Sequence, residues 1–325
     1  MPITVHLLET FEPEVMEHLR ARLSAAVQLS AGPQVPADTE LLVANAPDRA
    51  HLTASPALRA VIVPFTGVPE PLRALLLEFP ALSLHNSRWP TIPTAEGALT
   101  LLLAAAKFVV PADRAFRQHN WEMRYRPSPS ILLAGKTVAV LGFGAIGQRV
   151  GGMCHGLGMR VLGVRRTAGR PPALDYPAEV HPVSALRAVL PQAQVLIITL
   201  PLTAETRDLI GAEELALLAR PAFLVNVGRA AVIQEAALYN ALRDGPLTAA
   251  GLDVWYAYPT DAASRAHTPP AQYPFHELEN VVLSPHRIDL VREHHARLAE
   301  ELAQTLNAAA RGEPLPNRVD VAAGY

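Results

Sequence analysis

Residues 137–167 read TVAVLGFGAIGQRVGGMCHGLGMRVLGVRRT. The β-branched apolar run at 137–141 predicts a strand, and residues 148–157 predict a helix that ends at Gly158. A second apolar run, at 160–164, predicts another strand. Between the first strand and the helix lie residues 142–147, whose glycines have the spacing G-x-G-x-x-G. The stretch therefore predicts a strand, a tight glycine turn, a helix and a second strand.

The three glycines have distinct roles in such a turn. Gly142 makes the sharp turn out of the strand, Gly144 lets backbone approach a pyrophosphate, and Gly147 lets the helix pack closely against the strand. The N–H groups at the start of the helix, at Ala145 and Ile146, and the helix dipole then favour phosphate charge. The alternative is a glycine-rich turn in an ordinary α/β protein. The surrounding strands and helix favour a dinucleotide site.

The second strand ends in Arg165-Arg166-Thr167. A site for NAD carries an acidic residue about 20 positions after the glycines, where it binds the ribose 2′-hydroxyl. Here that place holds Arg165, and two cations with a hydroxyl suit a 2′-phosphate. The alternative is a solvated surface corner. The charge therefore favours NADP(H) as cofactor, with NAD as the second choice.

Length and composition limit the class of protein. The 325 residues are enough for two domains, and 50% hydrophobic residues allow a substantial core. A net charge of −2 argues against nucleic acid or an acidic membrane as partner, and the longest mainly apolar run, 98–106, is too short to span a bilayer. The single cysteine, Cys154, excludes a disulfide framework and fits a reducing, cytoplasmic compartment. We expect no metal site.

Apolar runs alternate with helical patterns along the chain, which predicts an α/β fold with parallel sheets. A small sheet is expected in the first 95 residues or so, with strands at 3–8, 41–44, 58–64 and 81–84. A long apolar helix follows, from Thr94 as its N-cap to about residue 109. Further strands are expected at 195–200, 222–226, 249–253 and 281–284. Together with the two strands around the glycine turn, they predict one doubly wound sheet of about six strands.

Three polar residues follow strands of the second half, where doubly wound folds bind their ligands: Arg229, Asp253 and His286. The Arg229 guanidinium can bind a carboxylate and an adjacent carbonyl, or form a structural ion pair. Asp253 can accept a hydrogen bond from a carboxamide, or cap a turn. A histidine is the usual proton donor to a carbonyl reduced near neutral pH, although most of the twelve histidines here are expected to be structural.

These residues belong to a series of motifs that resembles the D-isomer-specific 2-hydroxyacid dehydrogenases. The series consists of VLGFGAIG at 140–147, TLPLT at 199–203 with Glu205-Thr206, NVGR at 226–229, GLDV at 251–254 and SPH at 284–286. Five ordered motifs at compatible spacing are far more specific than any one of them. The first domain matches the family mainly in its alternation of strands and helices and in Thr66-Gly67-Val68.

The resemblance implies hydride transfer between NADP(H) and C2 of a small 2-oxo or 2-hydroxy acid. Arg229 would clamp the substrate and polarise its carbonyl, and His286 would exchange the proton. Asp253 would position the nicotinamide carboxamide, and backbone N–H groups near Gly67 and Val68 would hold the substrate carboxylate. The cofactor site would be completed by Leu200, Pro201, Thr206 and Val227.

The resemblance also implies two Rossmann-like, doubly wound domains, with the nucleotide-binding domain inserted into the substrate-binding one. Residues 1–95 plus 290–325 would form the flavodoxin-like substrate-binding domain, and residues 96–289 the dinucleotide-binding Rossmann domain. The long helix from Thr94 would serve a homodimer interface.

The chain departs from the family pattern at four places. Tyr258 stands where the family has a glutamate that pairs with the histidine, which makes Tyr258 a catalytic candidate. Pro69 replaces a glycine and removes one N–H donor. Arg287 replaces a small residue after the histidine, and either binds a second anionic group of a substrate or faces solvent. The stretch 260–275 is longer than usual and is either a lid or a dimer contact.

The missing glutamate affects the expected pH dependence of the reaction and also leaves alternative functions open. Unless Glu277 or Asp289 replaces it, His286 should have a pKa near or below about 6.5, so reduction should fall off at lower pH than in glutamate-containing relatives. A nucleotide-binding sensor without turnover is one alternative, but it would need neither Arg229 nor His286. A formate- or phosphite-type dehydrogenase is another, although an arginine at position 165 favours reduction by NADPH.

Overall fold

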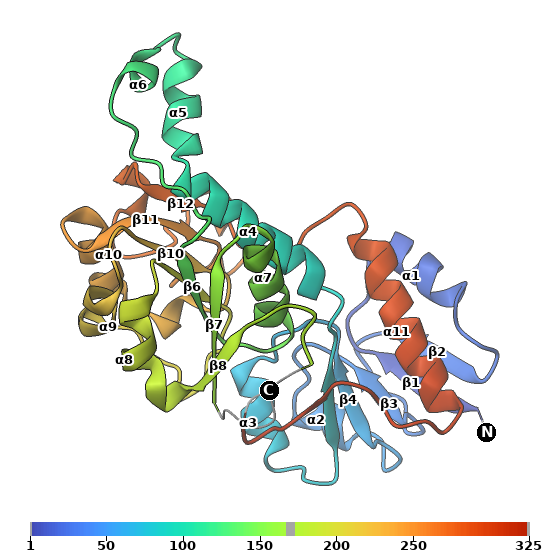
Figure 1. The fold of residues 1–325 in the computed structure, drawn as a ribbon. Coiled ribbons are helices and arrows are strands. Elements are labelled where there is room, and N and C mark those ends of the chain that lie inside the picture. The colour runs from blue at the N-terminus through green and yellow to red at the C-terminus, as the bar shows by residue number, and fades with distance from the viewer. Residues whose placement is uncertain (1, 167–172, 324–325) are drawn as a thin grey trace. The chain divides into compact units, whose positions relative to one another are not determined.

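The computed structural model describes residues 2–166 and 173–323. The chain divides into two compact units (Figure 1). Unit 1 consists of the residues up to Thr91 together with those from Leu290 onward, and unit 2 is Ile92–Asp289. The chain thus leaves unit 1, forms unit 2, and returns to unit 1.

Unit 1 is built on a six-stranded sheet with the order β13-β5-β4-β3-β1-β2. Its strands are β1 (Ile3–Leu7), β2 (Val27–Ala31), β3 (Leu41–Val43), β4 (Ala60–Val63), β5 (Ser83–Asn86) and β13 (Arg318–Val319). All pair in parallel except β13, which runs antiparallel to β5. The strand order reverses between β1 and β3, as in doubly wound folds of the flavodoxin type.

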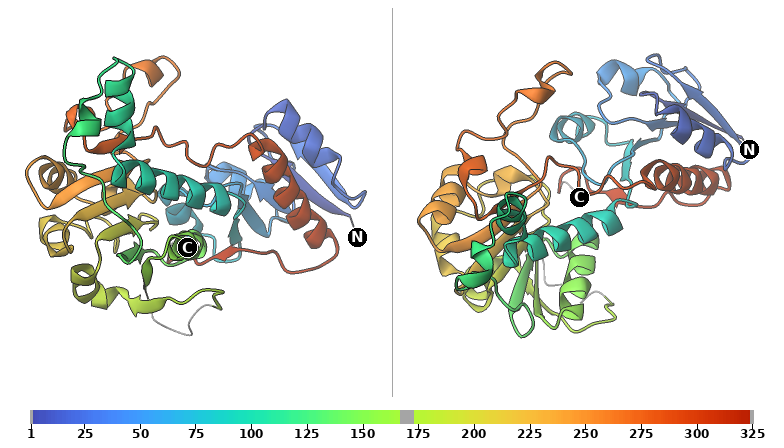
Figure 2. Two further views of the ribbon diagram at one scale, coloured as in Figure 1. Left: turned by 45° about the horizontal axis from the view of Figure 1, so that its top comes forward. Right: turned by 90° about the horizontal axis from the view of Figure 1, so that it is seen from above.

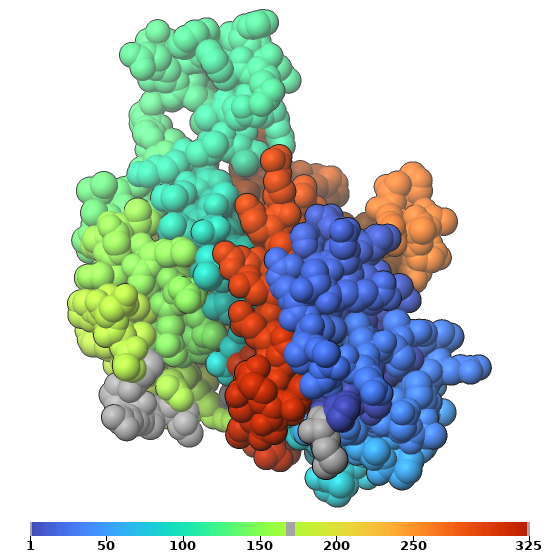
Figure 3. All heavy atoms as spheres, turned by 90° about the vertical axis from the view of Figure 1, so that its right-hand side faces the viewer, coloured from blue at the N-terminus to red at the C-terminus, as the bar shows by residue number. Residues whose placement is uncertain are grey.

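Helices cover both faces of this sheet. They are α1 (Pro13–Arg20), α2 (Arg49–Thr53), α3 (Glu70–Leu76) and α11 (His294–Ala310). On one face α1 packs beside α11, seen in blue and red in Figure 3, and Leu19 and Leu302 share one core there. On the other face, α2 and α3 contribute Leu52 and Leu72 to a second core.

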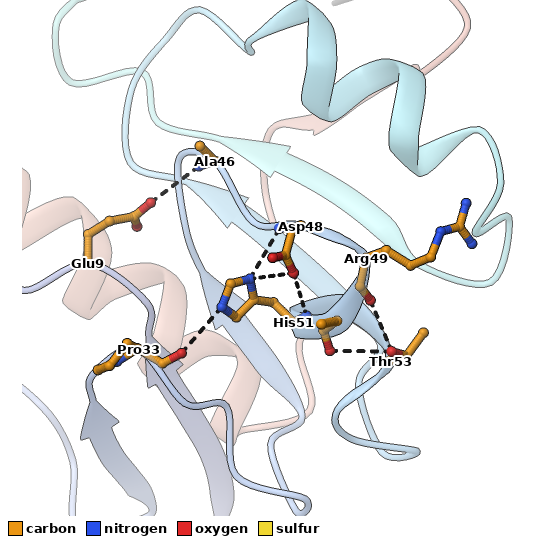
Figure 4. A network of polar contacts seen from close by, with 8 residues as sticks. Glu9, Pro33, Ala46, Asp48, Arg49, His51 and Thr53 are labelled. Carbon is orange, nitrogen blue, oxygen red and sulfur yellow. Dashed lines mark hydrogen bonds and ion pairs between the residues drawn. The ribbon is translucent and has the colours of Figure 1, made fainter.

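A polar cluster connects three loops that follow strands of unit 1 (Figure 4). The Glu9 carboxylate accepts the backbone N–H groups of Asn45 and Ala46 at 3.1 and 3.2 Å. Asp48 caps α2 by accepting the His51 N–H at 2.9 Å, and Nε2 of the same histidine lies 3.3 Å from the Pro33 carbonyl oxygen. The loops after β1, β2 and β3 are therefore fixed by their own side chains.

Unit 2 is built on a seven-stranded parallel sheet with the order β12-β11-β10-β9-β6-β7-β8. Its strands are β6 (Thr137–Leu141), β7 (Arg160–Arg165), β8 (Glu179–Pro182), β9 (Val195–Ile198), β10 (Ala222–Asn226), β11 (Leu247–Leu252) and β12 (Val281–Leu283). The strand order reverses between β6 and β9, beside the glycine turn. Two parallel-sheet α/β units confirm the predicted fold class.

Helices again cover both faces of the sheet. They are α4 (Thr91–Ala106), α5 (Val109–Phe116), α6 (Glu122–Tyr125), α7 (Ala145–Gly156), α8 (Leu186–Val189), α9 (Ala212–Leu217) and α10 (Glu235–Arg243), with short 3-10 turns η1 (Val183–Ala185), η2 (Leu190–Gln192), η3 (Ala230–Val232), η4 (Ser264–Ala266) and η5 (Phe275–Glu277). Leu102 of α4 and Val150 of α7 share one core, while α8, α9 and α10 pack into another on the opposite face. Burial on both faces explains why the strands are nearly continuous apolar runs.

Two elements of unit 2 differ from the expectation. The sheet has one strand more than expected, because β8 carries Glu179 and His181 and so shows no apolar run. As an edge strand, β8 is held by β7 and by the Arg160 guanidinium, which donates to the Glu179 carboxylate at 2.8 and 2.9 Å. The apolar helix starts at Thr91, so the prediction that Thr94 is its N-cap is wrong.

An arm, residues 109–132, extends away from the sheet of unit 2 (Figure 1) and projects at the molecular surface (Figure 3). It starts where Phe108, with φ 51, separates α4 from α5. Neither α5 nor α6 has a buried residue, and the arm exposes Val109, Phe116, Trp121, Tyr125 and Leu132. Within the described chain, no single helix meets the length and hydropathy of a membrane span, and only the bent pair α4 and α5 does so jointly.

Candidate active site

The glycine turn between β6 and α7 has the geometry of a phosphate-binding turn. Gly142 has φ +104, a conformation that side chains disfavour, and a Cβ there would lie 2.9 Å from the Leu200 nitrogen. A Cβ at Gly147 would lie 2.2 Å from the Gly142 carbonyl oxygen, so the start of α7 packs directly on the turn. A Cβ at Gly144 would meet no atom within 4 Å, which leaves open space beside the backbone.

The N–H groups at the start of α7 are available to a ligand. Among the residues described, no acceptor takes those of Ala145, Ile146 and Gly147, and the helical bonds begin with Gln148 N–H to Gly144 O at 2.9 Å. The dipole of the 12-residue helix adds positive potential at this end. The turn therefore fits the diphosphate of a dinucleotide.

The end of β7 carries the predicted cations. Arg165 is half-buried, Arg166 is exposed, and Thr167 lies outside the described residues. Over the described ranges, Arg165 has no carboxylate partner. Its charge is therefore available to an anion, which fits the 2′-phosphate of NADP(H).

The loops after β9 and β10 lie against the glycine turn. A Cβ at Gly228 would lie 2.5 Å from the Leu200 carbonyl oxygen. Thr206 Oγ1 donates to the Pro201 carbonyl at 2.8 Å, so this hydroxyl shapes its own loop. Val227 N–H donates to Ile198 O at 3.0 Å. The structure thus brings the four predicted cofactor residues of these loops, Leu200, Pro201, Thr206 and Val227, to the same edge of the sheet as Gly142.

Arg229 follows β10 and presents a guanidinium without a carboxylate partner. Its Nη1 donates to the Gly228 carbonyl at 2.7 Å, and the part of the chain that is described offers its side chain no other hydrogen bond and no ion pair. Asn226 shapes the turn by donating to the Arg229 carbonyl at 3.1 Å and accepting the Gly228 N–H at 3.0 Å. A half-buried guanidinium with unused donors is a site for a carboxylate.

His286 lies in a strained turn that Asp253 holds. The histidine has φ 54, a left-handed conformation that costs a residue with a side chain about 1–2 kcal/mol. The buried Asp253 carboxylate accepts the Ser284 hydroxyl at 2.5 Å and the Arg287 N–H at 3.0 Å, on either side of the histidine. These charge-assisted bonds offset the strain and orient the imidazole. The Arg287 side chain is exposed.

Tyr258 contacts the imidazole. Its hydroxyl oxygen lies 2.9 Å from Nδ1 of His286 and accepts the Trp255 N–H at 3.1 Å. The Trp255 indole donates to the Ser284 carbonyl at 2.8 Å, so this tryptophan joins the loops after β11 and β12. Nε2 of His286 has no partner in the described chain and is open to a ligand.

The charges around His286 set its protonation. Burial lowers its pKa below 6.5 and the Arg229 charge acts in the same direction, whereas Asp253 and Asp289 oppose both. Among the described residues Asp289 makes no hydrogen bond to the imidazole, whose Nδ1 has the Tyr258 hydroxyl as its partner, so Asp289 does not take the place of the missing glutamate. Burial raises the pKa of the Tyr258 hydroxyl, which stays protonated at neutral pH. Burial also raises the pKa of Asp253, against the hydrogen bonds from Ser284 and the Arg287 N–H.

The predicted carboxylate donors lie in unit 1, in the loop after β4. The N–H groups of Gly67 and Val68 donate to no acceptor of the described chain. Pro69 immediately precedes α3 and has φ −60, so its ring suits the start of the helix. A residue at this position donates no N–H within the helix, so the proline costs no hydrogen bond there.

Two residues that support the site were given no role from the sequence: Trp255, and Ser284 of the SPH motif. Ser284 directly follows a strand, which was a usable signal, but nothing in the sequence indicates where the Trp255 indole points. The segment between β11 and η5 forms an extended loop (Figure 2), anchored where Tyr256 and Ala257 donate to the Pro270 carbonyl at 3.1 and 3.0 Å. In the described ranges, no group of His, Cys, Asp and Glu side chains could hold a metal ion.

Comparison with known proteins identifies the family. Residues 99–287 match the family model described as D-isomer specific 2-hydroxyacid dehydrogenase, NAD binding domain. Glyoxylate reductases of Aeropyrum pernix and Korarchaeum cryptofilum are 38% and 36% identical over 71% of this chain, and the match spans 67% and 66% of their own length. A crystal structure of a D-isomer specific 2-hydroxyacid dehydrogenase from Xanthobacter autotrophicus Py2, in complex with NADPH and MES, matches 100% of both chains with a TM-score of 0.82 and 26% identity. The match to the family model covers nearly all of unit 2, and on this ground the chain belongs to the D-isomer specific 2-hydroxyacid dehydrogenase family.

Proposed function

We propose that this chain uses NADPH to reduce a small 2-oxo acid at C2, giving the D-2-hydroxy acid, and catalyses the reverse oxidation. The proposal rests on two residues that follow strands of the same sheet. The Arg229 guanidinium has unused donors, and Nε2 of His286 has no partner in the described chain. The acceptors of a 2-oxo acid match the parallel donors of a guanidinium. The similarity to glyoxylate reductases makes glyoxylate the first substrate to test.

In this proposal each residue has a separate task. Arg229 binds the substrate and stabilises the negative charge that develops on its carbonyl oxygen. His286, as the imidazolium, donates the Nε2 proton to that oxygen, and as the neutral ring it accepts the proton in the reverse reaction. NADPH, when bound, supplies the hydride. Asp253 and Tyr258 orient the imidazole. Asp253 would also accept a hydrogen bond from the nicotinamide carboxamide.

Cofactor binding is proposed for unit 2, which also supplies Arg229 and His286 to the substrate, and unit 1 is proposed to supply further donors to the substrate. Gly142, Gly144, Gly147 and the N–H groups of Ala145 and Ile146 would hold the diphosphate. Arg165, Arg166 and Thr167 would hold the 2′-phosphate, with Leu200, Pro201, Thr206 and Val227 along the rest of the cofactor. Gly67 and Val68 would donate to the substrate carboxylate. The similar Xanthobacter enzyme was crystallised with NADPH, which supports NADPH here, with NAD as the second choice.

Oxidation of NADPH with glyoxylate, hydroxypyruvate and pyruvate tests the function. We expect saturable turnover with at least one of these acids. Hydroxypyruvate or pyruvate should give the D-isomer, whereas the product of glyoxylate has no stereocentre. Tight NADPH binding without turnover on any acid would contradict the proposal and favour a sensor, for which Tyr258 in place of glutamate is the supporting observation. Reduction of NADP⁺ by formate or phosphite alone would instead favour a dehydrogenase of that type.

The cofactor preference depends on Arg165. Replacing Arg165 by Asp should raise the KM for NADPH about 10- to 100-fold, because a charge-assisted hydrogen bond becomes a repulsion. The KM for NADH should stay the same or fall. Arg220→Asp is the matched control, since Arg220 is exposed before the amino end of β10, the opposite edge of the sheet. An unchanged KM for NADPH in the Arg165 variant would show that the 2′-phosphate lies elsewhere.

A homodimer is proposed on the basis of the arm. Large apolar side chains exposed together mark an interaction surface, and the arm gathers several of them on helices without a buried residue. Trp121 and Phe116 stack edge to face with ring centroids 4.7 Å apart, which keeps them in place on the surface. A molar mass of one chain by light scattering at micromolar concentration would exclude the dimer. The cytoplasmic location stays a prediction from cysteine usage.

A further inference from the structure

We propose that Tyr258 is a positioning residue that donates its hydroxyl proton to Nδ1 of His286, so that the neutral imidazole carries its proton on Nε2. The hydroxyl oxygen and Nδ1 are 2.9 Å apart. The catalytic consequence of this arrangement rests on the proposed function, whereas the position of the proton is a property of the chain alone.

The direction of the bond follows from the other contact of Tyr258. Its oxygen already accepts the Trp255 N–H at 3.1 Å, and over the described part of the chain its own hydrogen has Nδ1 of His286 as its one acceptor. If Nδ1 donated instead, the oxygen would accept two N–H groups while its hydrogen had no protein partner. A neutral imidazole that accepts at Nδ1 carries its hydrogen on Nε2.

The charged groups around the ring agree with this arrangement. Asp253, after β11, is one of two carboxylates whose charge acts on the ring, but its Oδ1 already accepts two hydrogen bonds, from Ser284 and Arg287 N–H. Arg229, after β10, carries a positive charge that disfavours the imidazolium form of His286. Asp289, after β12, acts in the opposite direction. No described hydrogen bond joins a carboxylate to Nδ1.

Tyrosine therefore reverses the effect that a glutamate has at this position. A carboxylate accepts from Nδ1–H and stabilises the imidazolium, whereas a donating phenol stabilises the neutral ring. The neutral ring then offers an Nε2–H to the carbonyl oxygen of a 2-oxo acid. A hydroxy acid needs an acceptor at Nε2, so before oxidation the ring proton must move to Nδ1 and the Tyr258 hydroxyl must turn away. The resting neutral site thus favours binding of the oxo acid.

Nitrogen NMR of the ligand-free, ¹⁵N-histidine-labelled chain tests the inference, with His286 assigned by comparison with His286→Asn. Above its pKa, we expect His286 to be in the Nε2–H form. Tyr258→Phe should raise the His286 pKa by about 0.5 to 1, because one hydrogen bond to the neutral form is lost. Tyr258→Glu should convert the neutral ring to the Nδ1–H form and raise the pKa by about 1 to 3.

Tyr256→Phe is the matched control, because the Tyr256 hydroxyl donates to the Ile233 carbonyl at 3.0 Å and makes no described contact with His286. It should leave the His286 pKa unchanged. An Nδ1–H form in the unaltered chain, or a lower His286 pKa in Tyr258→Phe, would overturn the inference. Because NMR needs no turnover, an Nε2–H ring in a chain that reduces no 2-oxo acid would overturn the proposed function alone.

Discussion

Arg229→Ala is expected to lower kcat/KM for reduction of a 2-oxo acid about 10³-fold. The guanidinium is the donor whose hydrogen bonds strengthen as charge develops on the carbonyl oxygen, and its one described hydrogen bond within the protein is to the Gly228 carbonyl. Arg229→Lys should recover only part of the rate, because an ammonium keeps the charge but lacks the parallel donors. Steady-state kinetics with the best acid of the panel measure both variants.

The cofactor provides an internal control for this loss. The dissociation constant for NADPH should stay within about threefold in Arg229→Ala, because its phosphates are proposed to bind at the glycine turn and at Arg165. Arg220→Ala removes an exposed arginine at the other end of the same strand and should leave the rate unchanged. A value of kcat/KM in Arg229→Ala close to that of the unaltered chain would remove Arg229 from the mechanism.

His286→Asn should lower kcat for reduction about 10²- to 10⁴-fold, because an amide of similar size cannot donate a proton to the developing alkoxide. The pH dependence gives a second measurement. The imidazolium is the donor, and its fraction falls as pH rises through a pKa that burial holds below 6.5. In the unaltered chain kcat/KM should therefore be constant at low pH, fall about tenfold per pH unit above that pKa, and lose this dependence in the variant.

His276→Asn is the control, because His276 is an exposed histidine of η5 whose nearest charged partner is Glu277 at 4.0 Å. It should change neither kcat nor the pH profile. A profile for the unaltered chain that stays flat to about pH 9 would contradict donation by the His286 imidazolium. Proton donation by His286 would equally be excluded if His286→Asn kept its full rate.

The sheet around the glycine turn could be predicted from the sequence because its signals are local. Apolar runs of strand length and three glycines at fixed spacing need no distant residue to be recognised, and the turn at Gly142 follows from them. Elements without such signals were missed. β8 is short and polar and forms through its pairing with β7, and β13 consists of two residues that pair with β5.

The catalytic candidates were found by position, since each follows a parallel strand and such strands end at one edge of a sheet. Their geometry was not predictable. Tyr258 and His286 are 28 residues apart, and their contact exists because two neighbouring strands end side by side. The left-handed turn at His286 depends on the Asp253 carboxylate, which accepts from residues 31 and 34 positions away.

The residues in their order were enough to predict two kinds of chemistry for this chain: a phosphate-binding turn with arginines after it, and an arginine and a histidine at strand ends. The hydrogen-bond partner of each of these groups could be identified only in the folded chain. Periodicity and backbone conformation are encoded within a few residues, whereas the partner of a buried donor depends on which distant loops the packed sheet brings within 3 Å or so of it.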